Sequence, residues 1–341
     1  MSSTTTTTSP PPYEVDECRG VLRVFSDGSI VRTPGPSFPV PVVDDGTVEW
    51  KDVQFDPANG LHLRLYKPRR TGPARPRLPI FFYFHGGGFC IGSRTWPNCQ
   101  NYCLRLASDI GALVVSPDYR LAPEHRLPAA IDDAALAVEW LRDRAASDEW
   151  VADAADLGSV FISGDSAGGT IAHHLAVKFG SAAGRAELGP VRVRGYVLLG
   201  PFFGGTQRSR SEAECPTDAF LNLELNDRFW RLSVPLGADT DHPLVNPFGP
   251  ESPGLEGVEF EPMLVVVGGH DLLRDRAVEY AERLKGWGKP VEVAEFAGQQ
   301  HGFFTINPWG EPANELMGVL KRFIDENGNG NGNGKGNGGS S

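Results

Sequence analysis

The chain has 341 residues, a length typical of one large domain or of one domain with a cap. Hydrophobic residues make up 40% and charged residues 22% of it, which excludes wholesale disorder. The net charge of −11 repels phosphate backbones and anionic lipids, so we expect no nucleic-acid partner and no insertion into a membrane. The five cysteines lack the spacing of a disulfide framework, and we therefore expect a reduced, cytoplasmic protein.

Both ends of the chain have low complexity. Residues 1–12 (MSSTTTTTSPPP) and 327–341 (NGNGNGNGKGNGGSS) cannot bury enough apolar surface to fold. The N-terminal segment is rich in Ser and Thr like some transit peptides, but acidic residues precede the first arginine. We expect two disordered tails that flank a single domain at 13–326.

Taken in chain order, strand patterns alternate with helical patterns. The first is a half-exposed strand at 61–65, where leucines alternate with polar residues. Short apolar runs, typical of strands covered on both faces, follow at 80–84, 112–115, 160–162, 196–199, 263–267 and 291–296. Helical patterns occupy 129–144, 170–179, 274–287 and 313–325. This alternation predicts an α/β fold with a mostly parallel central sheet and helices on both faces.

One long segment interrupts the alternation. Residues 202–257 are rich in Pro, Gly and polar residues, which is typical of an insertion. We expect them to form a small cap over the C-terminal ends of the strands. The turn-rich segment 13–50 is expected to contribute further walls to the same pocket.

The motif that carries chemistry is Gly164-Asp165-Ser166-Ala167-Gly168, which lies between an apolar strand and a helical pattern. A sharp strand-to-helix turn lifts the serine hydroxyl out of the sheet, and the start of the helix offers N–H groups to an oxyanion. Ser166 is therefore the candidate nucleophile.

A second glycine-rich segment follows the strand at 80–84. His85 is followed there by Gly86, Gly87 and Gly88. Consecutive glycines allow backbone N–H groups to approach a substrate, which suits an oxyanion hole completed by the N–H of Ala167. The segment lacks the Lys-Ser/Thr of a phosphate-binding P-loop.

A nucleophile of this kind needs an acid and a histidine further along the chain, in that order. Asp271 follows the strand at 263–267, and His301 follows the last strand at 291–296. Open α/β sheets bind their ligands at these strand ends. Asp275 is a competing acid, although the pattern places it within a helix, and His174 or His270 could replace His301.

These motifs together resemble the hormone-sensitive-lipase branch of the α/β hydrolases and, within it, the plant class-I carboxylesterases. Further matching segments are Asp118-Tyr119-Arg120-Leu121-Ala122-Pro123-Glu124 and His301-Gly302-Phe303. The motifs span residues 80–305. The resemblance implies an α/β-hydrolase fold with Ser166 as nucleophile, His301 as base and Asp271 as the acid that orients the histidine. Gly87 and Gly88 would be the chief oxyanion donors with Ala167.

The activity that the resemblance implies is hydrolysis of a small or medium carboxylic ester, with a short acyl group or of lactone type, through an acyl-enzyme. No cofactor is required for this reaction. The same branch includes the plant gibberellin receptors, which lack the triad histidine and close a long helical lid over the hormone. A receptor with little or no turnover is therefore the alternative function.

A metalloenzyme is a third class of function. The candidate ligands are His173-His174, His270-Asp271 and the pair Cys99 and Cys103, and none has the spacing of a metal site. We expect no metal, and we expect Cys99 and Cys103 to be buried thiols one helical turn apart.

Overall fold

The structure, a computed structural model, describes residues 11–36, 41–69 and 76–328, which fall into two compact units, Met1–Pro39 and Val40–Ser341. The tails expected at 1–12 and 327–341 lie outside the described residues except for residues 11 and 12 and the end of the last helix, which continues to Gly328. Among the described residues, no helix has the length and apolarity needed to cross a bilayer.

The first unit contains a small antiparallel sheet in the order β1-β2-β3. Its strands are β1 (Glu14–Cys18), β2 (Leu22–Phe25) and β3 (Ile30–Arg32). Asp27 shapes the turn between the last two strands, because its carboxylate accepts hydrogen bonds from the backbone and side chain of Ser29. Its expected contribution to the pocket walls stays a prediction.

The second unit is built on an eight-stranded sheet in the order β11-β10-β9-β8-β6-β7-β5-β4. The strands are β4 (Val48–Asp56), β5 (Leu61–Pro68), β6 (Leu78–Phe84), β7 (Leu113–Pro117), β8 (Ala155–Asp165), β9 (Val193–Leu199), β10 (Met263–Gly268) and β11 (Val291–Phe296). Strands β4 and β5 are antiparallel to their neighbours, and the other six run parallel to one another. The predicted mostly parallel sheet is confirmed.

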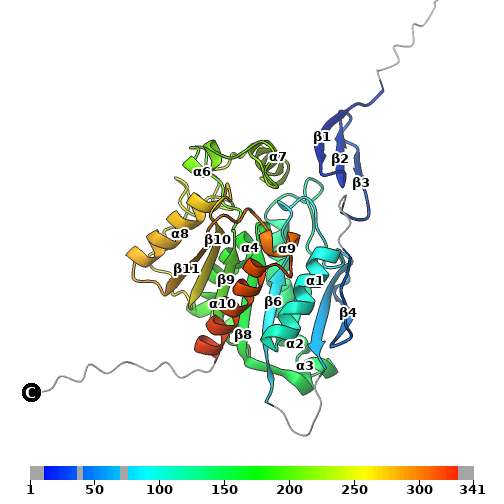
Figure 1. Ribbon diagram of the computed structural model, residues 1–341, viewed down its shortest axis with the longest axis vertical. Helices are drawn as coiled ribbons and strands as arrows, with labels where there is room; N and C mark the ends of the chain where they lie inside the picture. The colour runs from blue at the N-terminus through cyan, green and yellow to red at the C-terminus, as the bar shows by residue number, and fades with distance from the viewer. Residues whose placement is uncertain (1–10, 37–40, 70–75, 329–341) are drawn as a thin grey trace, which may run out of the picture. The chain divides into compact units, whose positions relative to one another are not determined.

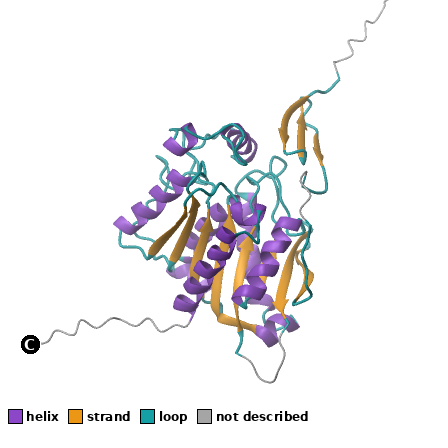
Figure 2. Cartoon of the chain, viewed as in Figure 1, coloured by secondary structure: helices purple, strands orange, loops and turns teal. Residues whose placement is uncertain are grey.

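Helices cover both faces of this sheet (Figures 1 and 2). They are α1 (Pro97–Arg105), the π-helical turn η1 (Leu106–Ile110), α2 (Ala129–Arg144), α3 (Glu149–Ala154), α4 (Ala167–Phe179), α5 (Ala182–Glu187), α6 (Arg210–Ala213), α7 (Leu223–Ser233), α8 (Arg274–Gly286), α9 (Phe303–Ile306) and α10 (Glu311–Gly328). Residues of α1, η1, α9 and α10 form one buried core with side chains from the sheet. Helices α4 and α8 pack against other residues of the sheet, and α2 packs on α4. The predicted two-sided arrangement is confirmed.

The insertion expected at 202–257 contributes α6 and α7 between β9 and β10. Figure 1 shows both helices beyond the C-terminal ends of the parallel strands. The parallel strands therefore direct their C-terminal loops, which carry the candidate site residues, toward the insertion.

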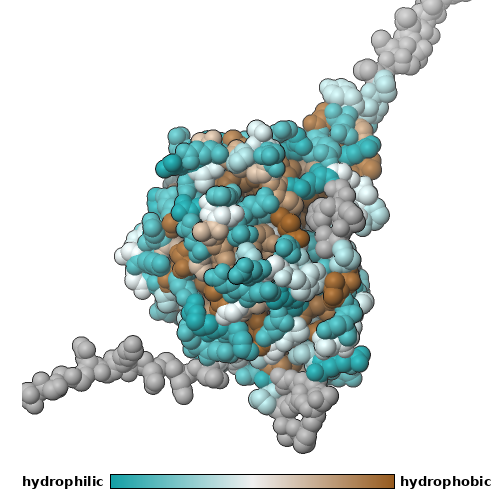
Figure 3. Space-filling model, in the orientation of Figure 1, coloured by the Kyte–Doolittle hydropathy of each residue, from teal (hydrophilic) through white to brown (hydrophobic). Residues whose placement is uncertain are grey.

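The face displayed in Figure 3 is mainly hydrophilic, with small apolar areas among the polar residues.

Candidate active site

Ser166 occupies the sharp turn between β8 and α4. Its φ of 54° and ψ of −117° form a conformation that is rare for a residue with a side chain. The turn is tight because Gly168 has no Cβ, and a Cβ built there would lie 1.9 Å from the backbone oxygen of Phe84. The N–H of Ser166 donates to the carbonyl of Leu199 at the end of β9 (2.8 Å). The structure thus contains the strand–turn–helix setting expected for a serine nucleophile, with the residue itself buried.

Asp271 and His301 meet at the ends of the neighbouring strands β10 and β11. Nδ1 of His301 lies 2.7 Å from Oδ2 of Asp271, and both side chains are buried. Because a carboxylate only accepts, Nδ1 carries the hydrogen and Nε2 is left as the basic nitrogen. The other carboxylate oxygen of Asp271 accepts from the N–H of Leu273 (2.9 Å), which fixes its orientation. The order of the two residues and their places after two apolar strands predicted this pair, and the fold brings their side chains into contact.

The loop after β6 carries Gly86, Gly87 and Gly88. Gly87 has a φ of +119° and Gly88 a φ of +58°, which side chains disfavour. Within the part of the chain that the structure describes, the N–H groups of Gly87 and Gly88 donate no hydrogen bond. The N–H of Ala167 belongs to the first turn of α4, whose N–H groups lack an intrahelical acceptor. These three donors suit a developing oxyanion.

The competing histidines have other partners. His173 is buried on α4 with its Nδ1 2.8 Å from the hydroxyl of Tyr280. Nε2 of His174 bonds to the backbone oxygen of Leu244 (2.9 Å). Burial lowers the pKa of both histidines, so both are neutral side chains of the packed core. His270 is exposed beside the groove described below.

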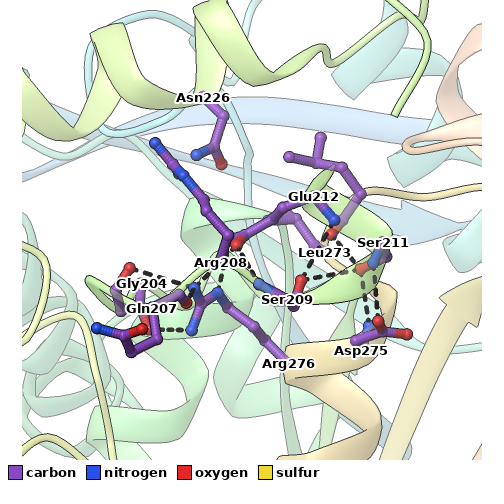
Figure 4. Close-up of polar contacts among 12 residues, drawn as sticks. Gly204, Gln207, Arg208, Ser209, Ser211, Glu212, Asn226, Leu273, Asp275 and Arg276 are labelled. Carbon is purple, nitrogen blue, oxygen red and sulfur yellow. Dashed lines mark hydrogen bonds and ion pairs between the residues drawn. The ribbon is translucent and has the colours of Figure 1, made fainter. Parts of the chain in front are cut away.

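The competing acid, Asp275, faces the insertion. Figure 4 shows its carboxylate beside Ser211, whose backbone N–H donates to it (2.8 Å). It also pairs with Arg274 (3.0 Å). Asp275 thus acts as an acceptor for the insertion, whereas Asp271 accepts from the histidine.

An ion pair anchors the insertion to α8 (Figure 4). The guanidinium of Arg276 bonds to the buried carboxylate of Glu212 on α6 (2.6 Å) and donates to the backbone oxygens of Gly204 and Gln207. Ser209 and Glu212 close the same turn as a capping box. The contacts replace the hydration that both charges lose on burial. They connect the insertion to the helix that begins just after Asp271.

A groove of about 710 Å³ opens beside Asp271. The insertion supplies one side of it through residues 210–219, and the loops after β10 and β11 supply the other. Ser166 and His301 do not line it, whereas a smaller pocket is lined by His301, Asp271, Gly200 and Asp165. Asp165 is a second carboxylate near the histidine, and it entered the sequence argument only as part of the serine motif.

Cys99 and Cys103 lie on α1, and both are buried free thiols, as expected. In the described residues, no three His, Cys, Asp or Glu side chains converge into a group that could hold a metal ion.

Known proteins resemble this chain over most of its length. A family model described as the α/β hydrolase fold matches residues 81–305. An amyloplastic tuliposide A-converting enzyme of Tulipa gesneriana is 35% identical over 308 residues, which cover 89% of this chain and 78% of that enzyme. A gibberellin receptor of Arabidopsis thaliana is 36% identical over 305 residues (86% and 81%). The solved structure of an esterase from Pyrobaculum calidifontis superposes with a TM-score of 0.67 at 31% identity, covering 82% of this chain and 85% of that one.

Proposed function

The chain belongs to the α/β-hydrolase family, in its hormone-sensitive-lipase-like branch, and is a carboxylesterase-type enzyme; we propose that it hydrolyses small or medium esters through Ser166, His301 and Asp271. The observation that carries the proposal is the 2.7 Å contact of His301 with Asp271 after β11 and β10, while the turn of Ser166 is hydrogen-bonded to the end of β9, the strand next to β10. The contact leaves Nε2 as the base that a serine nucleophile requires.

The reaction proceeds through an acyl-enzyme. Oγ of Ser166 bonds to the ester carbonyl carbon while its proton moves to Nε2 of His301, and the carbonyl electron pair moves onto oxygen. The N–H groups of Gly87, Gly88 and Ala167 receive that negative charge. The tetrahedral species expels the alcohol, which takes the proton from His301, and water then repeats the attack and releases the acid.

Aromatic side chains favour a short acyl group. Phe229 of α7 packs on Gly88, because a Cβ at that glycine would lie 2.2 Å from the Phe229 ring. Behind it, the rings of Phe202 and Trp230 are stacked with centroids 3.8 Å apart, and both are buried. These rings fill the space next to the oxyanion loop, so a long acyl chain would have to displace them. Lactones and other compact esters would also bind without displacing these rings.

Covalent labelling tests the nucleophile. A fluorophosphonate probe should label wild-type protein once, at Ser166, and hydrolysis of 4-nitrophenyl acetate should disappear together with the label in Ser166→Ala. The matched control is Ser163→Ala, which removes a buried hydroxyl of β8 that is not assigned to the reaction. Undiminished labelling or hydrolysis in Ser166→Ala would refute the assignment.

Similarity to a gibberellin receptor keeps a binding function as the second candidate. The Asp271–His301 pair favours turnover over retention of the ligand, because it prepares a base that binding alone does not need. Mass spectrometry after hours with catalytic amounts of protein separates the two functions. Wild type should consume its ester over many turnovers, and Ser166→Ala and His301→Ala should leave it intact. Intact ligand with wild type, across short-chain esters and plant lactones, would support the receptor.

We keep the cytoplasm as the proposed location. The tulip relative carries the description amyloplastic, so a plastid is the competing site. A fluorescent fusion at the C-terminus of the full chain, viewed in plant cells, distinguishes the two locations.

A further inference from the structure

Asp165 is the last residue of β8 and directly precedes Ser166. It is half-buried and lines the same small pocket as His301 and Asp271. The hydroxyl of Tyr83 donates to its Oδ1 (2.6 Å). Its Oδ2 lies against the oxyanion loop, because a Cβ at Gly86 would be 2.4 Å from that oxygen. The carboxylate therefore sits between the nucleophile turn, the oxyanion loop and the histidine.

The polar surroundings of Asp165 favour its ionised form but only partly offset the effect of burial, which leaves the pKa of its carboxyl group above the ordinary value. Burial raises the pKa of this carboxyl group, whereas the Tyr83 hydroxyl, the nearby His301 and His85, and the N–H of Gly86 lower it. The tyrosine is itself buried on β6, and burial together with the charge of Asp165 holds its pKa well above the ordinary value. Near neutral pH the Tyr83 hydroxyl is therefore neutral and donates to the carboxylate.

We propose that Asp165 is a positioning residue that acts through His301, as a second carboxylate that stabilises the imidazolium formed when Ser166 gives up its proton. This inference rests on the proposed function. Asp271 bonds to Nδ1 and orients the ring, and Asp165, which lines the same small pocket, adds negative charge. An opposite charge close to a histidine favours its protonated form. The cation formed in the transition state is thereby stabilised.

The contact with Gly86 adds a second effect. The N–H of Gly86 interacts with Asp165, so we expect it not to serve as an oxyanion donor. The donors that remain for the oxyanion from this loop are those of Gly87 and Gly88. Asp165 thus links the proton acceptor and the oxyanion loop through one side chain.

Other titratable groups face this site. Burial is the main cause that raises the pKa of Tyr102 on α1 and of Tyr119 after β7, and the charge of Asp165 adds to it, so neither carries a charge near neutral pH. Asp118 and the buried thiols Cys90, Cys99 and Cys103 lie around these tyrosines, and Cys215 lies near Asp271. Around His301, the carboxylates of this set are therefore Asp271 and Asp165, and Asp118 lies beside His85 and Tyr119.

The test is the pH dependence of kcat/KM for 4-nitrophenyl acetate. Asp165→Asn keeps the size of the side chain and removes its charge. We expect the acid limb of the profile to move about one unit to lower pH and the plateau to fall about 10-fold, because His301 loses a stabilising charge. The matched control, Asp133→Asn, removes a buried carboxylate of α2 that pairs with Arg120, and its acid limb should stay at the wild-type position. A lower plateau with an unmoved limb in Asp165→Asn would overturn the proposal.

Tyr83→Phe provides a second variant that keeps the carboxylate. Without the hydroxyl, burial should raise the pKa of Asp165 further, so Asp165 should lose its charge at a higher pH than in wild type and the acid limb should move in the same direction as in Asp165→Asn. An acid limb identical to that of wild type would contradict the inference even if Asp165→Asn fails to fold. Direct titration of the His301 ring by NMR, with the signal assigned by its loss in His301→Ala, should show the same two shifts.

A failure of the proposed function would give other experimental results than a failure of the inference about Asp165. If wild-type protein does not hydrolyse the ester, or if Ser166→Ala hydrolyses it equally well, the triad assignment is wrong. If hydrolysis depends on Ser166 but the limb is insensitive to both variants, the triad stands and the role of Asp165 is wrong.

Discussion

Nδ1 of His301 lies 2.7 Å from Oδ2 of Asp271, across the gap between the loops that follow β10 and β11. The two loops are held together by a backbone bond from the N–H of His270 to the carbonyl of Gln299 (2.9 Å). The pairing of the parallel strands β10 and β11 therefore fixes the relative position of Asp271 and His301.

Replacement of Asp271 by Asn should lower kcat by roughly 10⁴, because an amide favours the wrong tautomer of His301. Asp275→Asn is the matched control and should retain most of the activity, since Asp275 binds the N–H of Ser211 instead. Steady-state kinetics with a model ester measure both variants. A larger loss in Asp275→Asn would transfer the role to that residue.

Substitution of Gly88 by Ala should lower kcat by about 10²- to 10³-fold, the usual loss when an oxyanion donor is misplaced. The added Cβ meets the Phe229 ring at 2.2 Å, so either the loop or α7 has to shift. Gly111→Ala is the control, since Gly111 has a φ of +76° but no neighbour within 4 Å of the added atom. Equal kcat losses in the two variants would show that backbone strain alone explains the effect.

Removal of one partner from the Arg276–Glu212 pair should destabilise the protein by about 3–5 kcal/mol, because the remaining charge stays buried without a partner. Arg276→Met tests this in urea unfolding, and Arg276→Met with Glu212→Gln should recover part of the loss. The exposed pair Arg322–Glu292 is the control, and Arg322→Met should cost about 0–1 kcal/mol. A loss in Arg276→Met as small as the control would contradict the expectation.

Stability should depend on His173 below neutral pH. Burial lowers its folded-state pKa well below the ordinary value, with His174 nearby adding to the effect, whereas the unfolded chain binds the proton near pH ~6.5. Between these two pKa values the unfolded state holds more protons, so the free energy of unfolding falls as the pH drops below about 6.5. The decline ends below the folded-state pKa. His173→Gln should show a weaker pH dependence of its urea midpoint, and an unchanged dependence would disprove the expectation.

Activity should survive exhaustive treatment with EDTA and should need no added cofactor, because the proposed proton transfers require only the side chains named above. Hydrolysis rates before and after dialysis against the chelator measure this. Loss of activity that zinc restores would reopen the metalloenzyme class.

The parallel part of the sheet was predictable from sequence because its strands are buried on both faces and read as apolar runs. The helix pattern at 129–144 coincides with α2, and the run at 291–296 coincides with β11. Helix α4 begins at Ala167 rather than at residue 170, because the serine turn leads directly into its first turn. Residue order and strand ends were therefore enough to place Ser166, Asp271 and His301 near one sheet edge.

Other elements gave weak signals. Strand β4 lies at the edge of the sheet and carries charged residues such as Glu49 and Lys51, so no apolar run marks it. Helix α1 buries the polar residues Gln100 and Asn101, which hides its helical period. The contact of Asp165 with Tyr83 joins two strands far apart in sequence, and no local pattern reports it. The sequence offered one signal for a role of Asp165, namely that this carboxylate directly precedes the candidate nucleophile.

The insertion begins in contact with Ser166, the proposed nucleophile, and this limits how insertions can be exchanged between relatives. The N–H of Phe202 donates to the carbonyl of Ser166 (3.0 Å), and the carbonyl of Phe202 accepts from Oγ1 of Thr170 (2.5 Å). A chimera that replaces residues from 202 onward would therefore alter the backbone of the serine turn. A graft that starts after Phe203 keeps both bonds, so the transplanted insertion should change the substrate range without rebuilding the serine turn.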